Sequence, residues 1–242
     1  MLSFCVRSAL RPLRFTVAFF ASPSVGAVFC GGGAALLFLR LWRLLPAARV
    51  FVFWRCAVVS VLFCGSRSFS SFPVVLGAVS RWLSVGGGVV CGSSAGADAL
   101  VVRAALSAGG ASSLCVLSAF SSSGAGAGAC SSVSSALAAS AAGASVVWLA
   151  GGPLSLPLRA RLAGRSASAA ALAAGGVVFS SGGPLGPGSS LAVSCLVSRG
   201  CPVWLFSPSP SPVRGLAGAW VPALFCGLSC FRFVSAQLSF GF

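Results

Sequence analysis

The single acidic side chain of this sequence, that of Asp98, lies just beyond a glycine-rich turn. Residues 89–91 form a short apolar run, and Gly92 and Gly96 bracket small residues where the backbone must turn sharply. From residue 97 to 108 apolar residues recur at helical spacing, so the segment predicts a buried strand, a tight turn and a helix. The start of such a helix presents unpaired N–H groups and the positive end of its dipole. This arrangement favours an anion, most often a phosphate.

Asp98 has two interpretations in this position. It can cap the first turn of the helix, or it can accept a hydrogen bond from a ligand hydroxyl. It is also the candidate catalytic residue, because the chain has no His, Lys, Glu or Tyr and general acid–base chemistry falls to Asp98 and the cysteines. A serine or cysteine nucleophile would lack the usual neighbouring base. Phosphate binding needs none of these groups, since glycine N–H groups, helix ends and arginines are sufficient.

The composition shows a strong nucleotide bias. Apart from Met1, Thr16, Asp98 and Gln237, the chain uses ten residue types that can all be encoded without adenine in the first two codon positions. Arginine is then the only available cation, so the net charge of +15 overstates the case for nucleic-acid binding. The mean hydropathy of +1.01 likewise overstates the case for a membrane protein. The same bias fits an unexpressed antisense reading frame, and the regular alternation described below argues against that alternative.

The eleven cysteines are poorly spaced for a metal site. There is no C-x-x-C motif, and Cys226 and Cys230 are the one closely spaced pair. A structural zinc site needs two such pairs, or one pair with histidines, so no metal is predicted. Several cysteines lie in apolar strand-like runs, where a thiol behaves as a small hydrophobic group. The odd count favours a reducing compartment, and we expect a cytoplasmic protein.

The sequence predicts an N-terminal extension, a main domain, a Ser-Pro linker and a C-terminal tail, at residues 1–55, 56–206, 207–212 and 213–242. The extension contains 25 uncharged residues between Arg14 and Arg40, interrupted by proline and glycines. It is interpreted as a disordered arm, as the product of a wrongly chosen start codon, or as a membrane anchor. The linker is expected to be extended. The tail either packs on the domain or stays free.

From residue 56 onward, strand-like runs alternate with helical patterns. Strands are predicted at 57–63, 89–91, 114–117, 145–149, 177–179 and 202–206. Helices are predicted at 73–85, 97–108, 131–142, 157–174 and from the third glycine turn to about Arg199. This alternation predicts an α/β fold, a Rossmann-like doubly wound parallel sheet in three α/β/α layers. The open edge of such a sheet is compatible with a homodimer.

Three glycine turns follow predicted strands, at residues 65, 92–96 and 182–188. Because ligands of such sheets bind beyond the carboxyl ends of the strands, these turns are expected to converge on one site. Arg67 stands beside the first turn and is predicted to contact the ligand, and Arg165 is a further candidate on the fourth helix. Three other arginines of this region are expected to be solvated surface charges: Arg103, Arg159 and Arg161.

The first two turns can be taken together with their strands. They read Val-Leu-Phe-Cys-Gly-Ser-Arg-Ser-Phe at 61–69 and Gly-Gly-Val-Val-Cys-Gly-Ser-Ser-Ala-Gly-Ala-Asp-Ala-Leu at 87–100. Over residues 57–206 the chain resembles the SLOG superfamily of Rossmann-like domains. That superfamily includes the DNA-processing protein A recombination mediators, the lysine-decarboxylase-like cytokinin-activating hydrolases, and small nucleotide-binding proteins of phages and plasmids. The pattern is most similar to the last group.

The resemblance implies a pocket with Gly65, Ser66 and Arg67 along one side and Gly92, Gly96 and Asp98 as its floor. The third turn, with Gly186, Gly188 and Ser189, is similar to the phosphate-holding Gly-Gly-x-Gly-[Thr/Ser] turn of the superfamily. Ser93 and Arg165 complete the predicted ligand-binding set. The hydrolases also use a glutamate after the third turn, and this chain departs from them because it has none.

The expected function is therefore the binding of a nucleotide or nucleotide-derived ligand, without a separate cofactor, by a module that could serve as a sensor. One alternative is a nucleotide-processing enzyme that uses Asp98. Another is a single-stranded DNA binder like the DNA-processing proteins, whose affinity would fall steeply with salt. Aromatic stacking platforms for single strands are not evident in the sequence.

Overall fold

The computed structural model describes residues 20–22, 25–27, 58–126 and 133–236. The chain forms two compact units, residues 1–58 and 59–242. In the first unit, β1 (Phe20–Ser22) and β2 (Val25–Ala27) pair antiparallel. The rest of the predicted extension lies outside the described residues. No helix in the described ranges combines the length and the apolar character needed to cross a membrane.

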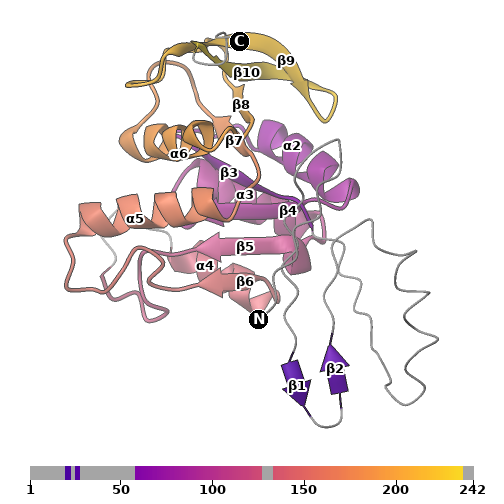
Figure 1. The fold of residues 1–242 in the computed structure, drawn as a ribbon, viewed down its shortest axis with the longest axis vertical. Helices are drawn as coiled ribbons and strands as arrows, with labels where there is room; N and C mark the ends of the chain where they lie inside the picture. Colours follow the sequence, from indigo (N-terminus) through magenta and orange to yellow (C-terminus); the bar gives the residue numbers. More distant parts are fainter. Residues whose placement is uncertain (1–19, 23–24, 28–57, 127–132, 237–242) are drawn as a thin grey trace. The chain divides into compact units, whose positions relative to one another are not determined.

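The second unit is built on an eight-stranded sheet in the order β6-β5-β4-β3-β7-β8-β10-β9 (Figure 1). Its first six strands in sequence are parallel. They are β3 (Ser60–Gly65), β4 (Gly88–Gly92), β5 (Leu114–Leu117), β6 (Ser145–Val147), β7 (Gly176–Phe179) and β8 (Val203–Phe206). The predicted α/β fold with a largely parallel sheet is therefore confirmed.

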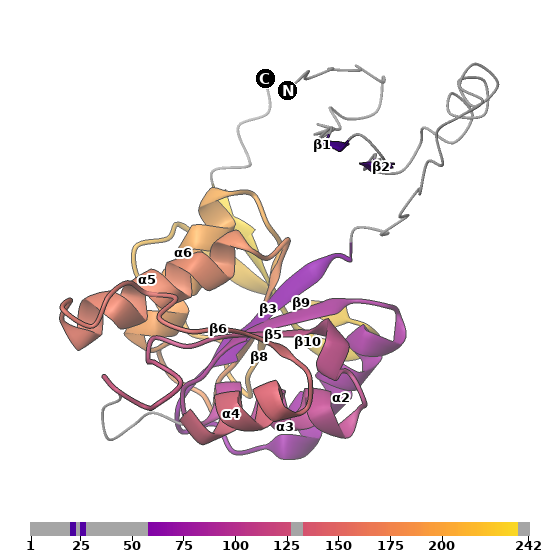
Figure 2. The same ribbon diagram turned by 90° about the horizontal axis from the view of Figure 1, so that it is seen from below.

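Helices cover both faces of the sheet (Figure 2). One face carries α2 (Phe72–Ser84), α3 (Ala97–Ser107) and α4 (Val133–Ala141), and the other carries α5 (Leu158–Ala171) and α6 (Pro187–Ser198). A short 3-10 turn, Ala111–Ser113, precedes β5. Each predicted helix of the domain is present, with ends that differ by up to three residues. Prolines stand in the first turns of α2 and α6, where a missing N–H costs no hydrogen bond.

The core is divided by the sheet into two apolar clusters, because successive side chains of a strand point to opposite faces. Phe63 and Cys91 pack with Val75 and Val101 on the side of α2 and α3. Leu62 and Val90 belong to the cluster with α5 and α6. The strands contribute nearly continuous apolar runs to the two clusters, as expected of a parallel sheet that is covered on both faces.

The direction of the chain reverses between β3 and β7. From β3 the chain runs through β4 and β5 to β6 at one edge, and it then returns through α5 to place β7 on the other side of β3. Leu62 pairs with Gly176, so strands far apart in the sequence lie side by side at the centre of the sheet. The carboxyl ends of β3 and β7 therefore border the crevice in which ligands of open α/β sheets bind.

The C-terminal tail forms a hairpin of β9 (Gly218–Phe225) and β10 (Leu228–Ser235) that extends the sheet beyond β8. Phe225 lies in the core, with its ring 5.1 Å from that of Trp204. The preceding Ser-Pro segment contains no helix or strand, and Trp220 Nε1 donates a hydrogen bond to the carbonyl of Ser211 at 3.0 Å. The tail thus packs on the domain, a point that the sequence left open.

Candidate ligand-binding site

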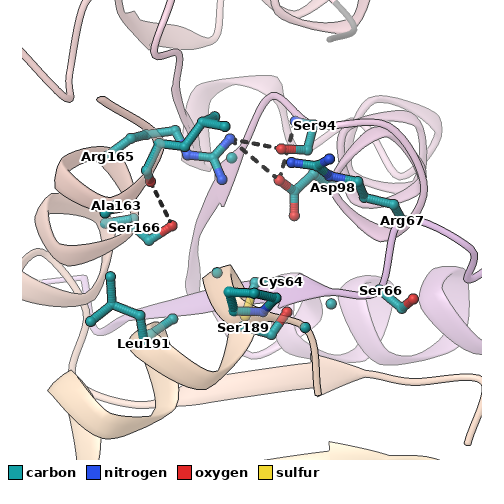
Figure 3. Close-up of a pocket in the computed structure, with 18 of the residues that line it drawn as sticks. Cys64, Ser66, Arg67, Ser94, Asp98, Ala163, Arg165, Ser166, Ser189 and Leu191 are labelled. Carbon is teal, nitrogen blue, oxygen red and sulfur yellow. Dashed lines mark hydrogen bonds and ion pairs between the residues drawn. The ribbon is translucent and has the colours of Figure 1, made fainter. Parts of the chain in front are cut away.

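A cavity of about 800 Å³ opens at the carboxyl ends of β3 and β4, bounded by α5 and the first turn of α6 (Figure 3). Its lining comes from four parts of the chain that are distant in sequence. These are Leu62, Cys64, Gly65, Ser66 and Arg67; Gly92, Ser94 and Asp98; Arg159, Leu162, Ala163, Arg165, Ser166 and Ala169; and Gly186, Pro187, Gly188, Ser189, Leu191 and Ala192. The three glycine turns predicted to converge do meet at this cavity.

Most of the predicted ligand-binding residues line the cavity: Gly65, Ser66, Arg67, Gly92, Asp98, Arg165, Gly186, Gly188 and Ser189. The structure places two others differently. Ser93 is fully buried outside the lining, and its hydroxyl has no hydrogen-bond partner. Gly96 has a φ of 79°, and a Cβ there would collide with the backbone of Arg67. Gly96 therefore shapes the turn, because L-residues rarely adopt this backbone conformation.

The centre of the polar side of the cavity is formed by the buried side chains of Asp98 and Arg165 and the half-buried Ser94. Arg165 Nη1 donates a hydrogen bond to Ser94 Oγ at 2.9 Å and lies 3.8 Å from Asp98 Oδ2. The backbone N–H of Ser94 donates to Asp98 Oδ2 at 3.2 Å. Arg165 Nε is buried without a partner. At 3.8 Å the two charges attract each other without a direct hydrogen bond, so the guanidinium keeps donors for a ligand.

Burial raises the pKa of Asp98 above its usual value, although Arg165 and the hydrogen bonds from Ser94 oppose the rise. The folded state then holds a proton more tightly than the unfolded state. The free energy of unfolding should therefore fall as the pH rises from about 4 through the pKa of folded Asp98, by at most about 1.4 kcal/mol per pH unit. Urea unfolding between pH 4 and 7 measures this loss.

The pH dependence between pH 4 and 7 can be assigned to Asp98, because the chain contains no other acidic side chain and no His or Lys. The Asp98→Asn variant serves as the control, since asparagine can still accept the Ser94 N–H but carries no titrating proton. We expect the pH dependence to disappear in this variant. An equal slope in both proteins would contradict a raised pKa for Asp98.

Gly92 makes room for the charged pair. A Cβ at this position would collide with Asp98 Oδ2 and would lie 2.9 Å from Arg165 Cζ. Gly92→Ala should therefore push the pair apart and lower the free energy of unfolding by about 1–3 kcal/mol, the usual cost of overpacking. Gly77→Ala is the matched control in α2, where the nearest atom to a new Cβ is 3.8 Å away. Urea unfolding of both variants measures the two effects, and the control should raise the free energy of unfolding by about 0.5–1 kcal/mol.

The first turn of α6 closes the cavity opposite the pair. Gly186 precedes the helix without a side-chain cap, and Pro187 follows it. Gly188 and Ser189 belong to the first turn of α6, so their N–H groups lie at the positive end of the helix dipole, and both residues line the cavity. This geometry is suited to a phosphate oxygen, as predicted for the third glycine turn.

The arginines expected on the surface differ from one another. Arg103 is exposed and stacks over the ring of Phe72 at 3.6 Å. Arg159 is exposed and also lines the cavity, which the sequence did not indicate. The expectation for Arg161 is wrong, because this side chain is only 4% exposed. Its guanidinium is instead fixed by three backbone carbonyls, those of Ala119 at 2.7 Å, Gly126 at 3.0 Å and Leu156 at 3.2 Å.

Besides Arg159, sequence reasoning missed the polar lining residues Ser94 and Ser166 and the apolar part of the lining. Ser94, which lies beyond the end of β4 at Gly92, lines the cavity in place of the predicted Ser93. The apolar part of the lining was also missed, namely Leu62, Cys64, Leu162, Ala163, Ala169, Leu191 and Ala192. Burial raises the pKa of the Cys64 thiol to about 12, and the Asp98 charge adds to the rise. Cys64 therefore stays neutral and acts as part of the apolar surface.

No protein-family model matches the sequence, and no match was found among curated proteins. Among solved structures, DNA processing protein A from Streptococcus pneumoniae is similar, with 19% identity, a TM-score of 0.48 and coverage of 65% of this chain and 52% of that one. This chain thus spans about half the length of that protein. DNA processing protein A from Helicobacter pylori, studied for its single-stranded DNA binding mode, gives 14% identity, a TM-score of 0.48 and coverage of 64% and 67%.

Proposed function

We propose that this chain binds a phosphate-bearing small molecule of the nucleotide type in the cavity between β3, β4, α5 and α6. The observation that carries the proposal is the buried guanidinium of Arg165, which is 8% exposed and has an Nε without a partner. A guanidinium with unused donors is suited to phosphate, because its planar fork can bind two oxygens at once. Asp98, held 3.8 Å away, supplies an acceptor for a ligand hydroxyl.

The surroundings of Arg165 support an anionic ligand. Arg67 and Arg159 also line the cavity, so its lining carries three arginines and one carboxylate. The first turn of α6 adds N–H groups at Gly188 and Ser189. The volume of about 800 Å³ falls within the range of about 300–1,000 Å³ that is usual for small-molecule sites. A mononucleotide fits these requirements of charge and size.

Calorimetric titration of the full chain with AMP, ADP, inorganic phosphate and a single-stranded oligonucleotide, at low and at high salt, tests the proposal. We expect one site for a nucleotide, retained at high salt because contacts to a buried arginine are weakly screened. Binding of the oligonucleotide alone, with a steep loss at high salt, would contradict the proposal. That result would favour single-stranded DNA, the ligand studied in the Helicobacter pylori protein.

A second candidate function is a reaction on the bound nucleotide, with Asp98 as general acid or base. It is favoured by the raised pKa of this buried carboxyl in a ligand-sized cavity. Incubation of nucleotides with the protein, followed by chromatography of the products, measures turnover. The Asp98→Asn variant should lose turnover and keep most of its affinity. Unchanged nucleotides in the presence of wild-type protein would leave binding as the function.

A further inference from the structure

The cavity has a second group of hydrogen-bond donors, at the first turn of α6. The backbone N–H groups of Gly188 and Ser189 make no hydrogen bond to any described residue, and the first backbone hydrogen bond of this helix runs from Ser190 N–H to the carbonyl of Gly186. Ser189 is 8% exposed and lines the cavity, and its hydroxyl has no partner in the part of the chain that the structure describes. The turn therefore combines an unpartnered hydroxyl with N–H groups at the positive end of the helix dipole.

These donors lie apart from the group formed by Asp98, Arg165 and Ser94. Figure 3 shows Ser189 across the cavity from Asp98 and Arg165. A Cβ at Gly92, the last residue of β4, would lie 2.9 Å from Arg165 Cζ, so the guanidinium stands over the end of β4. Helix α6 instead packs on β7 and β8, and β3 lies between β4 and β7. Because neighbouring strands are about 4.8 Å apart, the two groups of donors are separated by on the order of 10 Å.

One phosphate cannot contact both groups of donors. Hydrogen bonds to phosphate oxygens are about 2.8 Å long, so a phosphate held by Arg165 leaves the first turn of α6 without a partner. The lining from β3, between the two groups, consists of Leu62, Cys64 and Gly65. Burial raises the pKa of the Cys64 thiol to about 12, so this part of the lining is uncharged. A ligand that uses both groups therefore has an anionic group at each end of an uncharged spacer.

The charges around the first turn of α6 also favour an anion. Asp98 is the only acidic side chain of the sequence, and it belongs to the opposite group. No acidic side chain therefore repels an anion at Gly188 and Ser189. Arg159, near the start of α5, belongs to the same lining and adds positive charge to the cavity.

We infer that the first turn of α6 is a second phosphate subsite and that the preferred ligand carries two phosphate groups separated by its sugar. The inference rests on the proposed function and adds the number and the spacing of the phosphates. In a nucleoside 3′,5′-bisphosphate the two phosphates lie at opposite ends of the ribose. In a nucleoside diphosphate they share one bridging oxygen, which holds them too close together to reach both groups of donors.

Calorimetric titration of the full chain with AMP, ADP and adenosine 3′,5′-bisphosphate at high salt tests the inference. We expect the bisphosphate to bind about 10- to 150-fold more tightly than AMP, the gain from an added charged group that is hydrogen-bonded. ADP is the control for charge, because its second phosphate adds charge without the spacing. It should bind within about threefold of AMP, since salt screens the remaining attraction. A bisphosphate that binds no more tightly than AMP, or an equal gain with ADP, would overturn the inference.

Variants of the two subsites separate the two phosphates. Ser189→Ala removes the hydroxyl at α6 and should reduce the ratio of bisphosphate affinity to AMP affinity about 2- to 10-fold. Ser194→Ala, the same change in α6 outside the lining, is the matched control and should leave the ratio unchanged. Arg165→Gln should weaken both compounds alike, because both place a phosphate there.

The outcomes distinguish this inference from the proposed function. An equal loss of AMP and bisphosphate affinity in Ser189→Ala would mean that AMP already places its phosphate at α6, and the second subsite would be refuted. If AMP binds and the bisphosphate gains nothing, this inference fails alone. If neither compound binds, the proposed function fails with it.

Discussion

Replacing Arg165 with glutamine should weaken the binding of AMP about 10- to 150-fold, the range expected when a hydrogen-bonded charged contact is removed. The guanidinium is buried, its Nη1 donates a hydrogen bond to Ser94 Oγ, and its Nε has no hydrogen-bond partner. Glutamine provides fewer donors and no charge at this point. Calorimetric titration of wild type and variant measures the effect.

Loss of Arg165 can weaken binding in two ways, by removing its contact with phosphate and by leaving the charge of Asp98 unbalanced, and a second variant distinguishes them. Without Arg165 nearby, Asp98 loses the charge that favours its ionised form, and its pKa should rise further. The double variant Arg165→Gln with Asp98→Asn removes any repulsion between Asp98 and phosphate. If the double variant regained full affinity, Arg165 would act by neutralising Asp98 and would not contact the ligand. The matched control Arg159→Gln, at an exposed lining position, should cost far less because solvent screens its charge.

Replacing Arg161 with methionine should lower the free energy of unfolding by about 3–5 kcal/mol, since three carbonyls lose a charged donor at once. The three carbonyls belong to Ala119, Gly126 and Leu156. Methionine fills a similar volume but offers nothing to these acceptors. The arginine therefore joins the loop after β5 and the loop before α5 to the helix that carries Arg165.

Urea unfolding measures this effect, and Arg103→Met is the matched control. Arg103 is exposed and its guanidinium stacks on the ring of Phe72, so losing this contact should lower the free energy of unfolding by about 0.5–1 kcal/mol. A loss at Arg161 no larger than that at Arg103 would contradict the structural role. Nucleotide affinity, measured under conditions in which circular dichroism shows the Arg161→Met variant to be folded, should also fall because α5 is no longer held in place.

The positions of the glycine turns were predictable because strand and turn propensities depend on residues that are adjacent in the sequence. A run of β-branched residues followed by Gly92 and Gly96 requires a strand and a sharp turn whatever the rest of the chain does. Parallel strands then bring such turns to one edge, which places Gly65, Gly92 and Gly186 around one cavity. Which of Ser93 and Ser94 lines the cavity was not predictable in this way, because both residues lie in the turn beyond the end of β4 at Gly92.

The partners of the buried arginines were not predictable. Arg161 and Arg165 are one turn apart on α5 and face inward together, but no carboxylate pattern in the sequence marks that face. Arg161 is satisfied by backbone carbonyls, which every sequence possesses. The hairpin of β9 and β10 was also not predicted, because only β10 pairs with β8, through two residue pairs, and the packing of the hairpin depends on tertiary contacts of Phe225.

The central position of β3 affects how the chain is synthesised. This strand emerges from the ribosome before the other strands of its sheet, yet one of its edges waits for β7, in which Gly176 pairs with Leu62. At translation rates of about 5–20 residues per second, the interval is on the order of ten seconds. During that time a nascent chain exposes an apolar strand edge that can pair with other chains. Growing polypeptides that end between β6 and β7 therefore hold the strands β6-β5-β4-β3 with the second edge of β3 still unpaired.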